Sequence, residues 1–86
     1  MARALTVQRS RVAALDRPIF LSGVRRKRAH YGAAECRYWV FEDVESSGAF
    51  LEFVEAADRD TLDRAHATSP EPVSQGSPVY VEVEML

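Results

Sequence analysis

The sequence predicts an α+β fold in which the chain runs strand–helix–strand–strand–helix–strand. Three observations support this order. Apolar and polar residues alternate near both ends of the chain, two stretches carry apolar residues three or four positions apart, and two aromatic-rich stretches flank a Ser-Ser-Gly turn. The chain has 86 residues, of which 47% are hydrophobic. We therefore expect a single domain over residues 1–86.

The first strand and the first helix are predicted in the N-terminal part of the chain. Residues 4–12 alternate apolar and polar side chains, which is typical of a strand with one buried face. Asp16 is suited to cap the helix that follows, which extends to Ala34. The apolar stripe of this helix, interrupted by Lys27 or Arg28, contains Phe20, Val24, Tyr31 and Ala34.

The remaining elements are a hairpin, a short helix and a last strand. Two segments rich in aromatic and β-branched residues are separated by a turn, which predicts a β-hairpin. Asp58 caps the second helix, on which Leu62, Ala65 and His66 face inward together. The predicted bounds are Cys36–Val44 and Ala49–Glu55 for the hairpin strands, Asp58–Ala67 for the helix and Val79–Met85 for the last strand, after a loop over Ser69–Pro78.

Strands in this order, joined by short helical connections, form a four-stranded antiparallel sheet with both helices on one face, the ferredoxin-like arrangement. The alternation assigns side chains to two faces. We expect the helices to cover the more apolar set: Leu5, Val7, Trp39, Phe41, Leu51, Phe53, Val79, Val81 and Val83. The other face then contains Thr6, Gln8, Ser10, Tyr38, Val40, Phe50, Glu52, Val54, Tyr80 and Glu82. So short a chain has nothing left to cover this face, and we expect a second copy there.

Composition limits the classes of function. Residues 1–37 carry nine Lys and Arg against two acids, a balance of +7, and residues 38–86 carry two against eleven, a balance of −9. The net charge of −2 argues against a general nucleic-acid binder. With Cys36 as the one cysteine and no secretory or membrane-spanning apolar segment evident, we expect a cytoplasmic protein that does not bind membranes.

One stretch resembles a known family. The sequence GAFLEFVEAADRDTLDRAHATSP, residues 48–70, resembles the third strand and second helix of the antibiotic biosynthesis monooxygenase type of dimeric α/β barrel. Asp58, Leu62 and His66 match its helix cap, the Leu that follows and the late His, although His66 comes one residue later than usual. The stretch CRYWVFED resembles the partner strand, so the resemblance covers most of the chain.

The resemblance implies a homodimer whose sheets pack face to face, often with a small-molecule pocket in each subunit. The group includes cofactor-independent oxygenases of polyketide-like phenols, haem-degrading enzymes, isomerases and members without a known activity. Haem-degrading members rely on an Asn, and this sequence contains none. The resemblance therefore leaves a phenol oxygenase possible, in which aromatic and Arg side chains hold an anionic aromatic substrate.

Six residues are candidates for a site. His66 could act as a base near neutral pH, or it could be a structural histidine with satisfied hydrogen bonds. Glu52, on a central strand, is either paired with an Arg across the dimer, such as Arg9 or Arg28, or shifted toward a catalytic pKa. Trp39 is expected in the core, and His30 on the surface. The predicted ligand-binding residues, which would line a cavity between the sheet and the partner, are Gln8, Ser10, Tyr38, Glu52 and Tyr80.

Three functions compete. The first is a homodimeric enzyme or pathway protein that acts on a small aromatic molecule, and the second is a non-catalytic dimer that binds a metabolite or a protein. RNA-recognition modules share the order of elements, but Phe50 and Phe53 point to opposite faces and the first strand has no aromatic residue. No metal-ligand spacing, phosphate loop or nucleophile motif is present in the sequence, so no cofactor or metal is expected.

Overall fold

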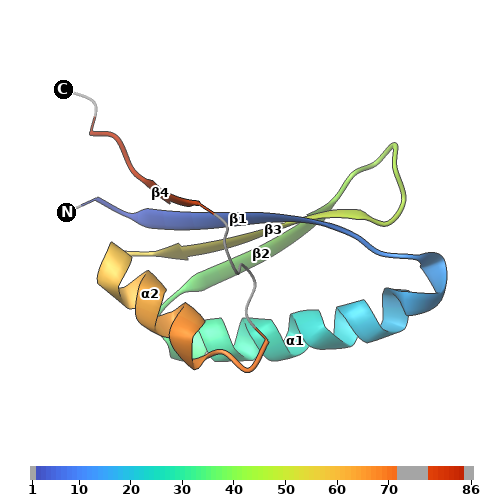
Figure 1. Cartoon of the computed structure of the whole chain (residues 1–86), viewed down its shortest axis with the longest axis horizontal. Helices are drawn as coiled ribbons and strands as arrows, with labels where there is room; N and C mark the ends of the chain where they lie inside the picture. The colour runs from blue at the N-terminus through green and yellow to red at the C-terminus, as the bar shows by residue number, and fades with distance from the viewer. Residues whose placement is uncertain (1, 72–77, 85–86) are drawn as a thin grey trace.

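A computed structural model describes residues 2–71 and 78–84 of the chain. Its elements are β1 (Ala4–Arg11), a short 3₁₀ helix η1 (Ala14–Asp16), α1 (Arg17–Ala33), β2 (Arg37–Glu42), β3 (Ala49–Ala56), α2 (Arg59–Thr68) and β4 (Val79–Val81). The strands form one antiparallel sheet in the order β2-β3-β1-β4, and both helices lie on the same side of it (Figure 1). The predicted ferredoxin-like α+β fold is confirmed.

The helix starts agree with the sequence in one case and differ in the other. The Asp58 carboxylate accepts a hydrogen bond from the backbone N–H of Thr61 at 2.8 Å, so the predicted cap of α2 is confirmed. The Asp16 side chain makes no such bond to α1. The chain enters α1 through η1 instead, and the Asp16 backbone N–H already bonds to the carbonyl of Ala13.

The last strand is shorter than predicted. β4 pairs with the start of β1, and the register joins Thr6 to Val79 and Ala4 to Val81. Among the described residues beyond Val81, the pairing continues through the backbone N–H of Glu82 to the carbonyl of Arg3, the residue before the start of β1 at Ala4. Part of the predicted loop, residues 72–77, and Met85 lie outside the described residues.

The assignment of the two sheet faces was wrong for the first three strands. The side chains that point at the helices belong to even-numbered residues, among them Ala4, Thr6, Tyr38, Phe50, Glu52, Val54 and Ala56, all of them buried. The more apolar set lies on the opposite side: Leu5, Val7, Trp39, Phe41, Leu51 and Phe53, with Tyr80 from β4 beside Leu5. We call this set the open face. In β4 the assignment was correct for Val79, which packs against the helix-side core, and for Tyr80.

The open face remains apolar and exposed in the single chain. Trp39 is 38% exposed, Phe41 57% and Tyr80 53%. No helix of the described chain lies on this side of the sheet (Figure 1). The expectation that one face would lack cover is therefore correct, but the uncovered face is the more apolar one.

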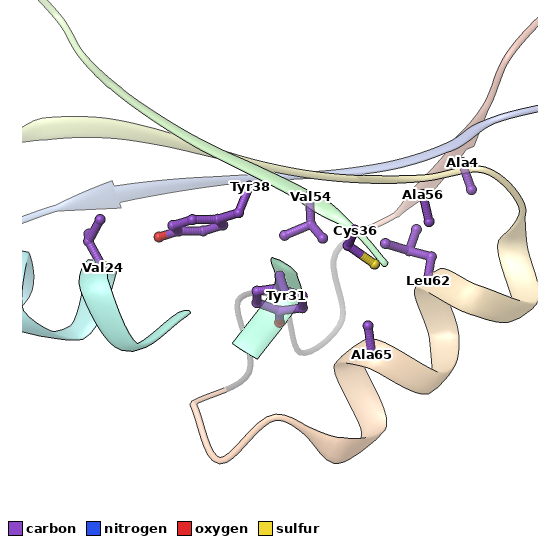
Figure 2. Packing of buried hydrophobic residues seen from close by; sticks show 9 residues of the cluster. All are labelled: Ala4, Val24, Tyr31, Cys36, Tyr38, Val54, Ala56, Leu62 and Ala65. Carbon is purple, nitrogen blue, oxygen red and sulfur yellow. The ribbon is translucent and has the colours of Figure 1, made fainter. Parts of the chain in front are cut away.

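The core lies between the sheet and the two helices. Tyr38 and Val54 point from the sheet toward Val24 and Tyr31 of α1, and Leu62 approaches Ala56 from α2 (Figure 2). The predicted stripe of α1 is confirmed, because Val24 and Tyr31 are buried and Phe20 and Ala34 pack against the same cluster.

The hairpin between β2 and β3 is fixed to the end of β1. Gly48 has φ +88°, and a Cβ there would lie 2.3 Å from the carbonyl oxygen of Val12. The backbone N–H of Val12 bonds to the Gly48 carbonyl at 2.8 Å. The hairpin connection rises on the side of the sheet away from the helices (Figure 1), so it borders one end of the open face.

Candidate functional site

A buried carboxylate lies at the centre of the helix-facing side of the sheet. Glu52 of β3 has a side chain only 1% exposed, and one of its oxygens accepts two hydrogen bonds. The Lys27 ammonium donates to this Oε2 from 2.8 Å, and the Tyr38 hydroxyl donates to it from 2.5 Å. A buried charge requires such partners, because desolvation of a lone carboxylate costs several kcal/mol.

Gln8 lies next to this carboxylate, and one of its polar atoms lacks a hydrogen-bond partner. Gln8 of β1 is directly opposite Glu52 of β3 in the sheet register. Its carboxamide oxygen is buried and has no hydrogen-bond partner within the described structure. An unpaired buried acceptor usually costs about 1–3 kcal/mol, so its presence requires an explanation beyond stability.

His66 belongs to a second group of hydrogen bonds on the same side. Its Nε2 is 3.0 Å from Oγ1 of Thr6, and its Nδ1 is 2.9 Å from the Tyr31 hydroxyl. A neutral imidazole has one donor and one acceptor nitrogen, and a hydroxyl accepts or donates as required. The Tyr31 ring stacks on Tyr38, with centroids 5.8 Å apart, so the two groups are in contact.

Burial changes the acidity of two members. It raises the pKa of the Tyr38 phenol, and the bond to Glu52 adds to that effect, so Tyr38 stays protonated and donates. Burial lowers the pKa of His66 below its ordinary value of 6.5, and the imidazole is therefore neutral near pH 7. The two groups thus place a neutral base and a carboxylate that accepts two hydrogen bonds on one side of the sheet.

The structure brings together some of the predicted site residues and separates others. Gln8, Tyr38 and Glu52 are neighbours on the helix-facing side of the sheet, and His66 of α2 is linked to them through Tyr31. None of the four lies on the open face. Tyr80 lies on the open face.

Ser10 lies near the hairpin end of β1, opposite Phe50, where it borders a hollow. The expected pairing of Glu52 with Arg9 or Arg28 was wrong, because Lys27 of the same chain occupies that position.

Other placements also differ from the expectation. Trp39 is on the open face rather than in the core, as the reversed parity requires. His30 is half-buried, and its Nε2 donates to the carbonyl of Ala65 at 2.9 Å, which joins the two helices. Lys27 and Tyr31 were not expected as members of the site. The signal for Lys27 was present, since it interrupts an apolar helix stripe opposite a strand that carries a Glu.

Hollows in the surface lie at the two ends of the sheet. One of about 600 Å³ borders the hairpin end of the open face and is lined by Arg9, Arg11, Phe41 and Leu51 among others. A smaller one, of about 270 Å³, lies at the opposite end beside Tyr80 and Leu5.

The described residues contain neither a metal-binding cluster nor a membrane-spanning helix. Among residues 2–71 and 78–84, no group of three or more His, Cys, Asp and Glu side chains is arranged to hold a metal ion. No helix within the same ranges is both long and apolar enough to cross a bilayer.

Comparison with known proteins gives one strong structural likeness. No protein-family model matches the sequence, and no curated protein matches it either. The chain is similar to the crystal structure of a mutant of SnoaB, a cofactor-independent oxygenase from Streptomyces nogalater, with a TM-score of 0.64 and 18% sequence identity. The match covers 98% of this chain and 94% of that one. The predicted resemblance to monooxygenase-like α/β barrels is confirmed for the fold.

Proposed function

We propose that this protein is a cytoplasmic homodimer that binds a small phenol between its sheet and α1 and oxidises it with molecular oxygen, without a cofactor. One observation carries the proposal: in a fold shared with a cofactor-independent oxygenase, a buried carboxylate already accepts a phenol hydroxyl. Glu52 receives the Tyr38 hydroxyl beside an ammonium group and an unpaired carboxamide oxygen. A phenolic substrate would find here a hydrogen-bond acceptor for its hydroxyl, a cation beside it and a second acceptor.

The homodimer is supported by the open face. Its side chains come from all four strands and form a continuous apolar surface on the outside of the single chain. A surface of this kind marks an interaction site in most proteins that are not membrane-bound. A second copy offers the same surface, so the two sheets would pack face to face, as aligned sheets do in β-sandwiches.

The groups near Glu52 support proton transfer from a phenol. A phenol that displaces the Tyr38 hydroxyl would give its proton to Glu52 or to His66, which is neutral near pH 7. Lys27 would then stabilise the phenolate by its charge, and Gln8 would accept a hydrogen bond from a second hydroxyl. Entry of the ligand requires the Lys27 side chain, 13% exposed, to move from its place over the Phe20 ring.

The proposed reaction balances with oxygen as the one co-substrate. A phenol with a free para position and O₂ give the quinone and one water. One oxygen atom enters the ring, the other leaves as water, and all the electrons that O₂ accepts come from the phenol. The protein needs to supply only binding, deprotonation and exclusion of bulk water.

The test is oxygen consumption with 1-naphthol, followed with an oxygen electrode and by the absorbance of the quinone. We expect one quinone for each O₂ consumed, and a loss of roughly 100-fold or more in kcat/KM for Glu52→Gln. Glu45→Gln, an exposed carboxylate in the hairpin turn, is the matched control and should keep full activity. His66→Ala tests the second base. Stabilisation of the fold by naphthol without oxygen consumption would contradict the oxygenase.

A non-catalytic dimer that binds a metabolite is the second candidate. It is favoured by the number of satisfied groups, since Lys27, Tyr38 and His66 all have hydrogen-bond partners within the chain. This function predicts that phenols raise Tm, that His66→Ala leaves binding unchanged, and that no quinone forms.

A further inference from the structure

The hollow of about 600 Å³ lies on the other side of the sheet from Glu52. Its lining comes from the hairpin end of β1, β2 and β3 and from Asp43 and Ser46 of the hairpin connection. Side chains and backbone of one chain line it, including Arg9, Arg11, Phe41, Ser46, Ala49 and Leu51. Its volume is in the range of small-molecule sites, which is about 300–1,000 Å³.

Two guanidinium groups face this hollow without a carboxylate partner. Arg9 and Arg11 are two residues apart on β1, so both project on the open-face side, opposite Leu51 and Ala49 of β3. Neither forms an ion pair in the part of the chain that the structure describes. Two cations held on one rigid strand attract an anion into the hollow.

Of the two carboxylates at the hollow, one is fully paired. Glu42 is held by both terminal nitrogens of Arg17, at 2.7 and 2.9 Å, and by the backbone N–H of Gly48. These bonds lower the pKa of Glu42 to about 2, so it stays ionised and paired. One Asp43 oxygen accepts the backbone N–H of Glu45 at 2.8 Å, and Asp43 forms no ion pair among the described residues, so its charge offsets part of the field of the two arginines. Arg9 and Arg11 are the two cations at the hollow that no ion pair occupies.

The apolar part of the hollow fits a planar ring. Phe41 is 57% exposed, and its ring is fixed edge-to-face against Phe53, with centroids 5.7 Å apart. Leu51 lies beside it in the register, opposite Arg9 on the next strand. An aromatic ring on Phe41 and Leu51 would place an attached carboxylate at the two arginines. Arginine binds carboxylates through two parallel hydrogen bonds.

We propose that this hollow is a second binding site, specific for an aromatic carboxylate. It is separate from the site around Glu52, since the sheet lies between them, and all of its walls come from one chain. The proposal therefore does not depend on the oxygenase activity. Because Phe41 and Leu51 also belong to the open face, it requires that a second copy leave this end of the open face uncovered.

The test is calorimetric titration of the full-length protein with 1-naphthoate, and with the neutral 1-naphthamide for comparison. The double variant Arg9→Gln/Arg11→Gln should bind naphthoate roughly 100-fold more weakly, about tenfold for each charged hydrogen-bonding group removed. Naphthamide binding, which uses only the ring contacts, should be weak in both proteins. The control Arg25→Gln/Arg64→Gln removes two exposed cations elsewhere and should keep the affinity within about twofold.

Three results would overturn the proposal. The first is equal loss of affinity in the test and control variants, which would mean a general charge effect. The second is a dimer weakened by Arg9→Gln/Arg11→Gln with naphthoate affinity unchanged, which would make these arginines interface residues. The third is loss of naphthoate binding in Glu52→Gln with the arginine variant unaffected, since that would place the ligand at the Glu52 site. Failure of oxygen consumption alone leaves this proposal in place.

Discussion

The two faces of the sheet differ in the side chains they carry and in what covers them. The face toward the helices includes small and polar side chains, and Ala4, Thr6 and Glu52 are fully buried there. The open face carries Trp39, Phe41 and Phe53 on the outside of the chain. The two helices offer few large apolar side chains, because α1 is rich in Arg and α2 in Asp and Arg. The difference teaches that the more apolar face of a sheet does not have to be the one its own helices cover.

The largest expected effect comes from a charge on the open face. Trp39→Asp should weaken the proposed homodimer by roughly 4–8 kcal/mol, because each of two copies would lose an aromatic residue from the proposed interface. Sedimentation equilibrium measures the change. Leu15→Asp, which alters an exposed apolar residue of η1, is the control and should leave the dimer intact. If Trp39→Asp behaves as Leu15→Asp does, the open face is not the interface.

The second largest expected effect is a loss of stability when Glu52 is removed from the helix-facing side of the sheet. Glu52→Ala should lower the free energy of unfolding by roughly 3–5 kcal/mol, because it leaves the Lys27 ammonium and the Tyr38 hydroxyl buried without their acceptor. Urea denaturation measures this loss.

A triple variant sharpens that result. Lys27→Met/Tyr38→Phe/Glu52→Leu removes both charges and the hydroxyl that Glu52 accepts, and it fills the space, so its stability should stay within about 1 kcal/mol of the parent or exceed it. Full stability without phenol oxidation would assign these polar groups to function. A large loss of stability in the triple variant would instead make them structural.

The smallest effect is a dependence of stability on pH. Burial lowers the pKa of His66 in the folded chain, so the unfolded chain takes up the proton first as the pH falls. The stabilisation is therefore complete above the ordinary pKa of 6.5 and is lost as the pH falls from there toward the folded value. His66→Gln should flatten this slope, measured by urea denaturation between about pH 7.5 and 5.5. His30→Gln leaves the burial of His66 and its Thr6 and Tyr31 contacts in place and removes only the smaller effect of the His30 charge on the His66 pKa, so it should retain most of the slope.

Much of the fold was predictable because local patterns determine it. The Asp58 cap, the stripe of α1 and the turn before Gly48 each follow from the residues within one element. The end of β4 was not predictable from its alternation, because its pairing partner begins only at Ala4 of a distant strand.

The candidate site was predictable in composition but not in place. Gln8, Tyr38 and Glu52 were expected on one face, and they do share one. Alternation fixes which residues lie together, yet it does not say which of two faces the helices cover. Lys27 lies 25 positions from Glu52, and only the packing of α1 on the sheet joins them.

The emission of Trp39 is the most direct measure of whether a second copy covers the open face, because it is the one tryptophan in the chain. We expect blue-shifted emission at micromolar concentrations, and a shift to longer wavelength on dilution over the range in which the sedimentation coefficient falls to that of one chain. Emission typical of water-exposed indole at every concentration, from a species that sediments as a single chain throughout, would contradict the account.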